Sequence, residues 1–322
     1  GAGLRELVAV APGAGAADTG RGPIVIRAIE AAAVRAVAAW VRRWPMDVVR
    51  RRGAALGRFA YAVDRRHRTI ALTNLAASLP GRSEAERRDV ARAMFEHFGS
   101  LLFELLKFDS YTPEQMRAAV DVEGAERVRE AYAQGRGVLF FTGHFGYWEI
   151  QAIVQPLVVE PVAVLARPLD NPALDRMLLD IRTRTGNTVI NRQGAVRKVL
   201  RELQANRAVA LLIDQHLHTP DAVYVEFFGR PAATPSALAA LALRTGAAVV
   251  PVFSLPLDGG RYKLVFESPV PPPEADTPDA VREFTQRCTD VLEMYVRRHP
   301  EQWLWMHRRW REERVGGRRP MS

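Results

Sequence analysis

The residue pair His144 and Glu149 offers the clearest chemistry in this 322-residue chain. An apolar run from Val138 to Thr142 leads through Gly143 to His144, and Gly146 follows before a helix start. A histidine that is oriented by a carboxylate acts as a general base. Residues five apart on one helix point about 140° apart, so Gly146 must bend the chain to bring them together. We therefore expect the carboxylate of Glu149 to hold the imidazole of His144.

The surroundings of His144 favour a catalytic site over an ordinary helix end. In the alternative interpretation, His144 caps a helix and Glu149 only faces the helix dipole. However, a strand, a glycine and a helix in that order, packed with Phe145, Tyr147 and Trp148, hold a side chain on a rigid scaffold. At the carboxyl edge of a parallel sheet, the next helix N-terminus also offers N–H groups to developing negative charge. We expect a base beside an oxyanion site.

Other catalytic arrangements have weaker support. The sequence contains no Gly-x-Ser-x-Gly elbow, and its one cysteine, Cys288, falls on an apolar helical stripe that predicts a core position. A single cysteine forms no intramolecular disulfide, which is compatible with a reducing compartment. His216 and His218 lack a third ligand cluster nearby, so we predict no metal site.

The elements that must position His144 alternate between strands and helices after residue 136. Short apolar runs predict strands at Val138–Thr142, Val162–Leu165, Thr188–Ile190, Val209–Ile213, Val223–Phe227 and Val249–Phe253. Capping residues followed by proline predict helix starts at Asn171-Pro172, Thr234-Pro235 and Thr277-Pro278. This order predicts an α/β fold with a mostly parallel central sheet covered by helices.

The N-terminal part is predicted to be helical. We expect a flexible leader at 1–22, amphipathic helices at 23–110, and an α/β core at 111–322 that forms one continuous catalytic domain with the helices. A capping box from Ser83 to Glu86 predicts the start of one helix. An earlier helix carries an apolar stripe, which could pack on the core or lie in a bilayer interface: Ile26, Ile29, Ala33, Val37, Trp40 and Trp44.

The charge pattern indicates an anionic partner. The formal net charge is +9, almost all of it from arginine, and arginines cluster at 50–52 and 65–68 beside apolar helices. No helix-turn-helix or ribonucleoprotein motif is present, so we expect no nucleic-acid partner. No apolar run is long enough to span a bilayer. Trp303, Trp305 and Trp310 beside arginines are expected in core or interfacial packing.

Several motifs in order resemble the lipid A late acyltransferases, which add lauroyl or myristoyl chains and are related to mycobacterial phosphatidylinositol mannoside acyltransferases. The resemblance runs from about Trp44 to Trp310. It is carried by Gly143–Glu149, Arg182–Gly186 leading to Asn191-Arg192, Asp214-Gln215, Phe227–Thr234 and Pro300–Trp310. The family's first helix is usually more hydrophobic and often spans the membrane, whereas here Arg27, Glu30 and Arg35 interrupt it.

The resemblance implies a glycerolipid-acyltransferase-like fold and O-acyl transfer from an acyl carrier protein thioester to a hydroxyl of a lipid A precursor or similar glycolipid. His144 would be the base with Glu149 as its partner. No cofactor is implied, and acyl-coenzyme A is an alternative donor. The alternative acceptor is a phosphatidylinositol mannoside or another membrane lipid. A basic binding module without catalysis is the other class.

The resemblance and the charge pattern also suggest substrate-binding residues and a location. Guanidinium groups suit phosphates on a lipid head group or a carrier-protein arm, and we favour Arg184 and Arg192, which fall inside motifs, over Arg167 and Arg182. Asp214 and Gln215 at a strand end are candidate substrate-binding residues, and the alternatives are that they position arginine side chains or are purely structural. We expect peripheral or monotopic attachment to the cytosolic face of the inner membrane, through its anionic surface.

Overall fold

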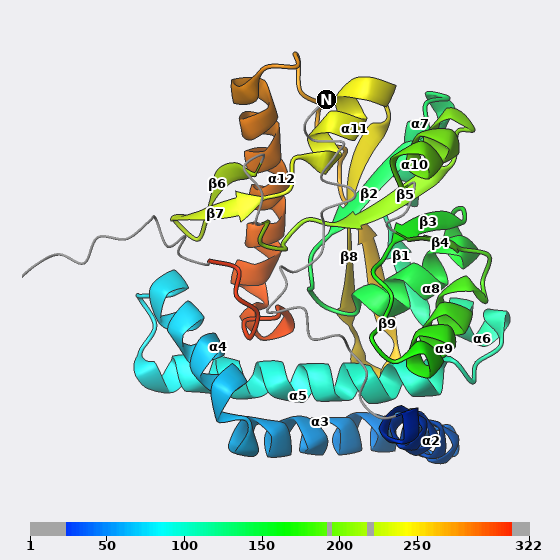
Figure 1. The fold of residues 1–322 in the computed structure, drawn as a ribbon, viewed down its shortest axis with the longest axis vertical. Helices are drawn as coiled ribbons and strands as arrows, with labels where there is room; N and C mark the ends of the chain where they lie inside the picture. Colours follow the sequence, from blue (N-terminus) through cyan, green and yellow to red (C-terminus); the bar gives the residue numbers. More distant parts are fainter. Residues whose placement is uncertain (1–23, 192–194, 218–221, 311–322) are drawn as a thin grey trace, which may run out of the picture.

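The computed structural model describes residues 24–191, 195–217 and 222–310. Among these, seven strands form one sheet in the order β1-β9-β8-β2-β5-β3-β4 (Figure 1). The strands are β1 (Val120–Glu123), β2 (Val138–Thr142), β3 (Val162–Leu165), β4 (Thr188–Ile190), β5 (Ala208–Leu212), β8 (Ala248–Pro256) and β9 (Tyr262–Phe266). The predicted leader, Arg192 and His218 lie outside the described residues.

The sheet is mostly parallel, which confirms the predicted fold class. Strands β8, β2, β5, β3 and β4 pair in parallel, while β9 runs antiparallel to β8 and pairs in parallel with β1. β2, β3 and β4 have the predicted bounds, and β5 and β8 lie within a few residues of them. The sequence did not indicate β1 or β9.

One predicted strand belongs to a different sheet. Within the described ranges, β6 (Val223–Phe227) pairs only with β7 (Arg230–Thr234), and this antiparallel hairpin packs on α12 (Pro278–Arg298). The predicted cap at Thr234 was wrong, because Thr234 ends β7 and Ser236 is the N-cap of α11 (Ala237–Thr245). The caps at Asn171 and Thr277 are confirmed by their side-chain hydrogen bonds to Ala173 and Ala280.

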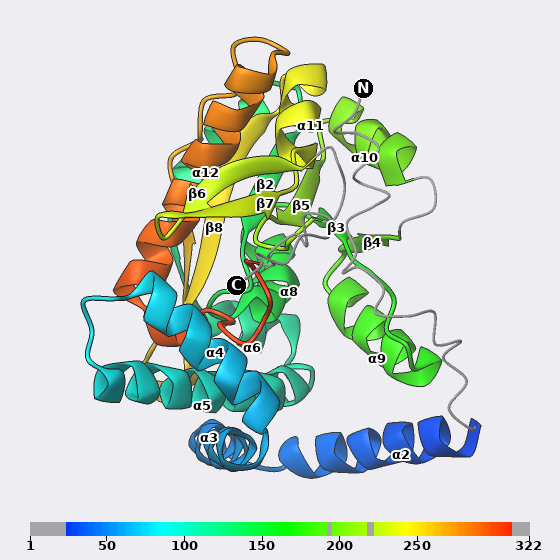
Figure 2. The same ribbon diagram turned by 60° about the vertical axis from the view of Figure 1, so that its left-hand side comes forward.

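Helices cover both faces of the sheet (Figures 1 and 2). Alternate residues of β2 point to opposite faces, so Phe140 packs in the cluster that contains Ile150, whereas Phe141 packs in the cluster that contains Leu238. One face carries α6 (Pro113–Ala118), α7 (Ala125–Ala133), α8 (Trp148–Val158) and α9 (Pro172–Thr183). The other carries α10 (Ala195–Gln204), α11 and α12.

The N-terminal helices pack together across one end of the sheet (Figure 1). They are α2 (Ile24–Val41), α3 (Met46–Val63), α4 (Arg65–Ser78) and α5 (Glu84–Phe108). α5 begins at the predicted capping box, which is confirmed by hydrogen bonds in both directions between Ser83 and Glu86. α3 lies so close to α5 that a Cβ at Gly57 would stand 2.0 Å from the carbonyl oxygen of Phe95. Only glycine fits there.

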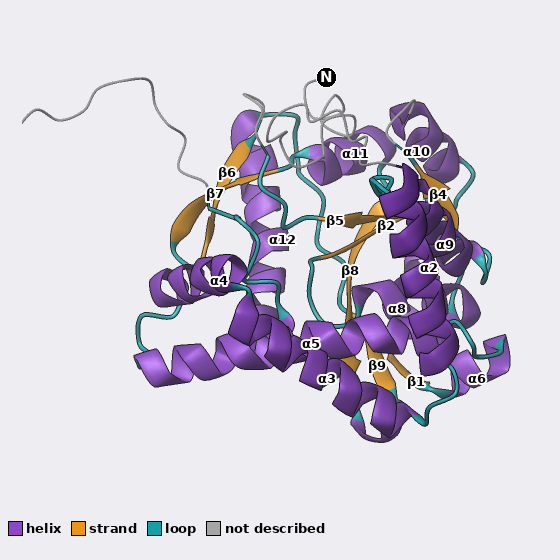
Figure 3. Cartoon of the chain, turned by 60° about the horizontal axis from the view of Figure 1, so that its bottom comes forward, coloured by secondary structure: helices purple, strands orange, loops and turns teal. Residues whose placement is uncertain are grey.

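The apolar stripe predicted near the N-terminus faces away from the core. Ile29 is 62 % exposed and Trp40 is 59 % exposed, whereas the buried side of α2 consists of Ala31, Ala38 and Val41. Core packing was therefore wrong for the exposed members of this stripe, whereas Trp44 packs against a small buried cluster that includes Val41 and Leu106. α2 lies beside α9 (Figure 3) and ends at Val41, so Trp44 follows the helix rather than continuing it. Among the described residues, no helix is both long and apolar enough to cross a membrane.

The C-terminal part completes the core. Cys288 on α12 is buried, as predicted. After the single turn Pro300–Gln302, Trp303 and Trp305 are fully buried and contact each other edge to face, which confirms their packing role. A second short turn, Asp258–Gly260, joins β8 to β9.

Candidate active site

His144 and Asp214 meet at the carboxyl edge of the sheet. His144 follows β2 and Asp214 follows β5, the neighbouring strand, so residues 70 positions apart come together. The Nδ1 atom of His144 lies 2.9 Å from Oδ1 of Asp214, and the backbone N–H of His144 donates to Oδ2 at 2.8 Å. Asp214 is buried, and the histidine side chain is 18 % exposed. A carboxylate therefore fixes both the ring and the backbone of the histidine.

This edge is also the point where the chain leaves the sheet in opposite directions. After β2 the chain enters α8 on one face, and after β5 it continues to the hairpin and α11, which packs on the other face. Such switch points leave a crevice outside the carboxyl ends of the strands. Pairing of β3 with β5 stops at Val164 and Ala210, which widens the gap. The fold thus builds a site beside His144.

The predicted partnership of His144 with Glu149 was wrong in its geometry. Gly146 has φ +58 and does bend the chain, and the N–H of Tyr147 then bonds Ser254, so that α8 begins at Trp148. In the first turn of α8 the side chain of Glu149 points toward α9. There Nε of Arg182 donates a hydrogen bond to Oε2 of Glu149 at 2.9 Å. A second bond joins the same side chains at 2.5 Å. Asp214 makes the hydrogen bond to the imidazole that we had expected of Glu149, while the charge of Glu149 still helps to raise the pKa of His144.

The protonation states follow from burial and charge. Burial opposes protonation of His144, but the charge and hydrogen bond of Asp214, together with the charge of Glu149, outweigh it, so the pKa of the imidazole is raised. Burial would raise the pKa of Asp214, but His144 and its hydrogen bonds hold that pKa well below its usual range. Asp214 is thus a carboxylate that accepts the Nδ1 proton. The lone pair of the neutral ring is then on Nε2, the atom a base needs.

The segment after α12 closes over this pair. Trp303 donates through Nε1 to Oδ2 of Asp214 at 2.8 Å, and the N–H of Leu304 donates to the carbonyl oxygen of His144 at 3.1 Å. The ring of His307 lies with Nε2 3.1 Å from the carbonyl oxygen of Asp214, and burial lowers its pKa to about 4. Asn74 on α4 donates to the carbonyl oxygens of Trp305 and His307 and so anchors the segment.

A buried arginine supports the same region. Arg309 is 1 % exposed and donates to the carbonyl oxygen of Ala233 at 2.6 Å. It also bonds the hydroxyl of Thr234, which belongs to the same strand. Burial lowers the pKa of Arg309 to about 10, against the attraction of Asp214. The cation therefore fastens the C-terminal segment to the β6–β7 hairpin.

A cavity of about 460 Å³ opens beside His144 and extends over both faces of the sheet. We call the part against α8 the α8 arm, which is lined by Thr142, Gln151, Ala152, Gln155, Val162 and Ala210. The part against α10 and α11 is the α11 arm, lined by Ile190, Ala195, Leu211, Ile213, Ala237 and Leu238. His144, Glu149 and Arg182 line the same cavity. Apolar walls beside a base suit a fatty chain and its reacting end.

The predicted binding residues separate into two groups. Arg167, Arg182 and Gln215 line the cavity, although Arg167 is half exposed and pairs with Asp170. Arg184 does not line it, because its guanidinium turns to Asp109 at the end of α5. The structure therefore places Arg182 rather than the preferred Arg184 at the cavity. Asp214 lies at the site, but it contacts His144 rather than the cavity.

The pairing of His144 with Asp214 was missed, although one signal was available. Both residues follow predicted strands directly, and parallel strands end at one edge of a sheet. His307 and Arg309 gave no such signal, because their partners depend on how the last segment folds back. Among the described residues, no group of three or more histidine, cysteine or acidic side chains could hold a metal ion.

A base-and-carboxylate pair beside a largely apolar cavity on an α/β sheet is an arrangement that an acyltransferase can use. Comparison with known proteins agrees, since the family model for bacterial lipid A biosynthesis acyltransferase matches residues 24–312. The chain belongs to this family of acyltransferases.

Individual relatives are distant. The chain is 29 % identical over 274 residues to a lipid A biosynthesis lauroyltransferase of Escherichia coli, covering 84 % of this chain and 88 % of that protein. It is 26 % identical over 227 residues to a phosphatidylinositol mannoside acyltransferase of Mycolicibacterium smegmatis, covering 69 % and 72 %. The crystal structure of the 1-acyl-sn-glycerophosphate acyltransferase of Thermotoga maritima aligns over 74 % of this chain and 93 % of that one, with a TM-score of 0.35 and 17 % identity.

Proposed function

We propose that the protein transfers a fatty acyl chain from an acyl carrier protein thioester to a hydroxyl of a lipid A precursor or similar glycolipid. The observation that carries this proposal is the His144–Asp214 pair at the wall of an otherwise largely apolar cavity. An alcohol is a weak nucleophile, and a positioned base is what it needs to attack a thioester. Membership of the family supports the acceptor class.

The proposed reaction is a direct transfer. Nε2 of His144 takes the proton of the acceptor hydroxyl as its oxygen attacks the thioester carbonyl, and Asp214 stabilises the imidazolium that forms. The tetrahedral intermediate then collapses, the carbon–sulfur bond breaks, and the thiolate takes the proton back from the imidazolium. The N-terminal turn of α8 begins four residues after His144 and presents N–H groups to the oxyanion.

The Glu149–Arg182 pair has a different proposed role. Both side chains line the cavity and each is about 15 % exposed, so Glu149 holds the guanidinium in place at the cavity wall. A guanidinium positioned by one carboxylate keeps further N–H groups for an anionic substrate group. We propose that Arg182 binds a phosphate of the glycolipid or of the carrier-protein arm, with Glu149 as its positioning residue and Arg167 and Gln215 at the same wall.

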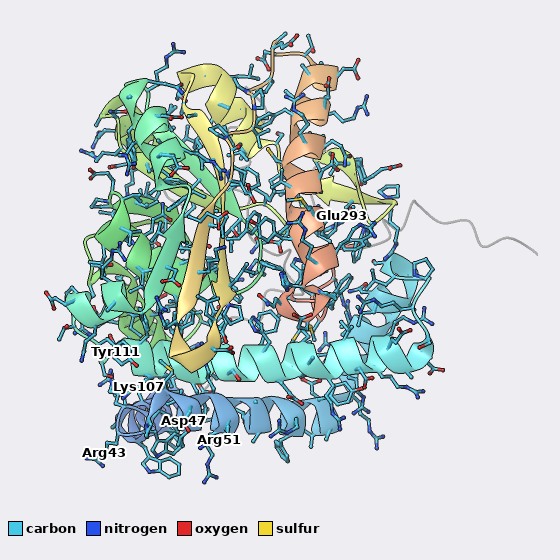
Figure 4. The ribbon with its side chains drawn as sticks, turned by 180° about the vertical axis from the view of Figure 1, so that it is seen from behind. Arg43, Asp47, Arg51, Lys107, Tyr111 and Glu293 are labelled. Carbon is cyan, nitrogen blue, oxygen red and sulfur yellow. The ribbon has the colours of Figure 1, made fainter. Side chains whose placement is uncertain are left out.

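The outer faces of α2 and α3 support peripheral attachment to a membrane. Their exposed large apolar side chains are Ile26, Ile29, Val37, Trp40, Leu56, Phe59 and Val63. Arg43 and Arg51 extend from the same end of the molecule, where α3 forms its edge (Figure 4). Exposed tryptophan and phenylalanine beside arginine are favoured at the interface of an anionic bilayer. We propose that this surface lies on the cytosolic face of the inner membrane.

Mass spectrometry of membrane lipids tests the proposed reaction. Cells that produce the active protein should contain a glycolipid heavier by one acyl chain than cells that produce His144→Ala, while His299→Ala, a partly exposed histidine away from the cavity, should act like wild type. A phosphatidylinositol mannoside as the acylated lipid would shift the acceptor to the alternative class. Identical lipid profiles with and without His144 would overturn the proposal.

Vesicle flotation tests the membrane surface separately. The protein should float with vesicles of anionic phospholipid at low salt, and Trp40→Ser combined with Phe59→Ser should weaken this by about tenfold. Tyr224→Ser, an exposed aromatic on the β6 hairpin, is the matched control. Equal flotation of the double variant and wild type would contradict the assignment of this surface.

A further inference from the structure

A second cavity lies outside the catalytic site, between α2 and α9, which run side by side (Figure 3). It is an open groove of about 370 Å³, a size within the range of small-ligand sites, which is roughly 300–1,000 Å³. Its lining residues are Arg35, Ala38, Arg42, Ala173, Arg176, Met177 and Asp180. None of these seven described residues lines the cavity beside His144, so the groove is a separate feature.

The spacing of the lining residues explains why a groove forms here. Arg35, Ala38 and Arg42 recur at intervals of three and four, so they share one side of α2 and of the turn that follows it. Ala173 and Arg176 are three apart on α9 and likewise share a face. The short alanine side chains leave room between the helices. The three arginines are exposed, so their guanidinium groups can be reached from solvent.

The groove carries an excess of positive charge. Asp180 is the only acidic residue among its described lining, against three arginines. The guanidinium of Arg42 is paired with Asp109 at the end of α5. Among the described residues, Arg35 and Arg176 have neither an ion-pair partner nor a hydrogen-bond partner. Two reachable guanidinium groups therefore keep all their N–H donors for an anion.

The two helices that form the groove are fastened to each other at both ends. Asn171, the N-cap of α9, donates through its side chain to the carbonyl oxygen of Arg27 near the start of α2 at 3.0 Å. At the other end, Asp109 binds both Arg42, just after α2, and Arg184, the C-cap of α9. The walls of the groove are thus held in place before any ligand arrives, which lowers the cost of binding one.

The position of the groove indicates which anion it meets. Arg35 and Trp40 are five residues apart and so point about 140° apart around α2. Trp40 belongs to the apolar surface that we propose lies in the membrane interface. A helix whose apolar side faces the acyl chains directs its other sides to the head-group layer. The anions of that layer are phosphates, which match the fork of N–H donors on a guanidinium.

We propose that the groove between α2 and α9 binds the phosphate of a membrane-lipid head group, with Arg35, Arg42 and Arg176 as its contacts. This inference rests on the proposed membrane surface and not on the proposed reaction. Arginines from two helices can donate to different oxygens of one phosphate. Because α9 also contributes Leu178 and Arg182 to the catalytic cavity, a lipid bound in the groove fixes that cavity relative to the bilayer.

Calorimetry with dihexanoyl phosphatidic acid, a soluble short-chain lipid, tests the site. All proteins carry Arg182→Gln, so that the arginine of the catalytic cavity does not contribute. Adding Arg35→Gln and Arg176→Gln should weaken binding by at least about tenfold. Arg197→Gln with Arg201→Gln removes the same charge from exposed positions on α10, outside both cavities, and should leave binding unchanged.

Three results of this calorimetry would overturn the proposal. The first is equal affinity of all the proteins for the short-chain lipid. The second is equal weakening in the groove variant and the α10 variant, which would reduce the effect to net charge. The third is binding of inorganic phosphate without binding of the lipid, which would assign the groove to a soluble phosphate instead.

Vesicle flotation then tests whether the phosphate is recognised at a bilayer. Phosphatidylcholine vesicles are given the same surface charge with phosphatidic acid or with oleic acid, whose anion is a carboxylate. The groove variant Arg35→Gln with Arg176→Gln should float about tenfold less with the first kind and nearly as wild type with the second. Trp40→Ser with Phe59→Ser should weaken both equally.

The outcomes separate this inference from the other proposals. Equal loss of the groove variant from both kinds of vesicle would show attraction by charge alone and overturn the phosphate site. Failure of wild type to float with either kind would overturn the membrane surface and with it the lipid source of the phosphate. Neither measurement requires acyl transfer, so both can succeed even if the proposed reaction is refuted.

Discussion

Two buried carboxylates hold the aromatic loop that contains His144, and they differ in what surrounds them. Asp214 is bonded by His144 and Trp303 at the wall of the cavity. Glu104, on α5, accepts hydrogen bonds from Tyr147 at 2.8 Å and from Tyr262, and forms an ion pair with Arg50 at 3.0 Å. Burial raises the pKa of Glu104, whereas His144 and its hydrogen bonds hold the pKa of Asp214 low.

The comparison of Asp214 with Glu104 shows that the position of a buried carboxylate determines what its charge can do. The partners of Glu104 are a cation and two phenols away from the cavity, so its bonds can only fasten α3 and α5 to the loop and to β9. The partner of Asp214 lines the cavity and has a free ring nitrogen, so its charge can affect a reaction. We infer that the first carboxylate contributes to stability and the second to catalysis.

Removing the base should give the largest effect. His144→Ala is expected to lower kcat/KM by about 10²- to 10⁴-fold, because the site loses the base that is positioned by Asp214 to take the proton of the acceptor. The thermal unfolding midpoint should change little, since the ring lies at the cavity wall. An active His144→Ala protein would show that Asp214 and His144 are no more catalytic than Glu104.

Neutralising Asp214 should have the next largest effect. Asp214→Asn is expected to lower kcat/KM by about 10²-fold, because the ring loses the partner that sets its tautomer and stabilises its charge. Burial then dominates, so the pKa of His144 should fall and the acid limb of the pH profile of kcat/KM should move to lower pH. If Asp214→Asn lowered kcat/KM but left the acid limb of its pH profile unchanged, Asp214 would have only a structural role.

The same type of change at Glu104 should affect stability instead. Glu104→Gln leaves the charge of Arg50 buried without its partner, which should lower the free energy of unfolding by about 3 kcal/mol. Urea unfolding measures this, and the folded fraction should keep kcat/KM and its pH profile within about threefold of wild type. Glu96→Gln, at a more exposed pair with Arg58, should cost no more than about 0.5 kcal/mol.

Arg184→Ala should have the smallest effect. Its guanidinium contacts Asp109 outside the cavity, so kcat/KM should change by less than about threefold, whereas Arg182→Ala should raise KM by about tenfold or more. Both are measured with the same glycolipid acceptor. Equal effects of the two variants would restore Arg184 as a substrate-binding residue.

Periodic features were predicted from the sequence more reliably than partnerships. β2, β3 and β4 were predicted residue for residue because each is a short apolar run bounded by polar or turn residues. β1 was missed because Val120 and Val122 alternate with acidic residues at the edge of the sheet, where burial is incomplete. Edge position alone does not explain the difference, because β4 is also an edge strand of incomplete burial and was predicted correctly.

The partners of the site residues depended on strand order, which no local pattern contains. Glu149 was assigned to His144 because it is near in sequence, but Asp214 is nearer in space because β5 pairs with β2. Arg182 and Arg184 stand two positions apart at the end of α9 and so point in different directions. Motif membership alone could not distinguish them.

The segment that closes over Asp214 has a consequence for biosynthesis. A nascent chain that has reached residue 300 already has both central strands and the walls of the cavity, yet it lacks Trp303, Leu304 and His307, which bond Asp214 or His144. The ribosome must therefore synthesise the chain through residue 307 before the histidine acquires its final setting. Premature termination before Trp303 should give an unstable and inactive product, because it removes two fully buried tryptophans from the core together with the contacts that hold Asp214 and His144.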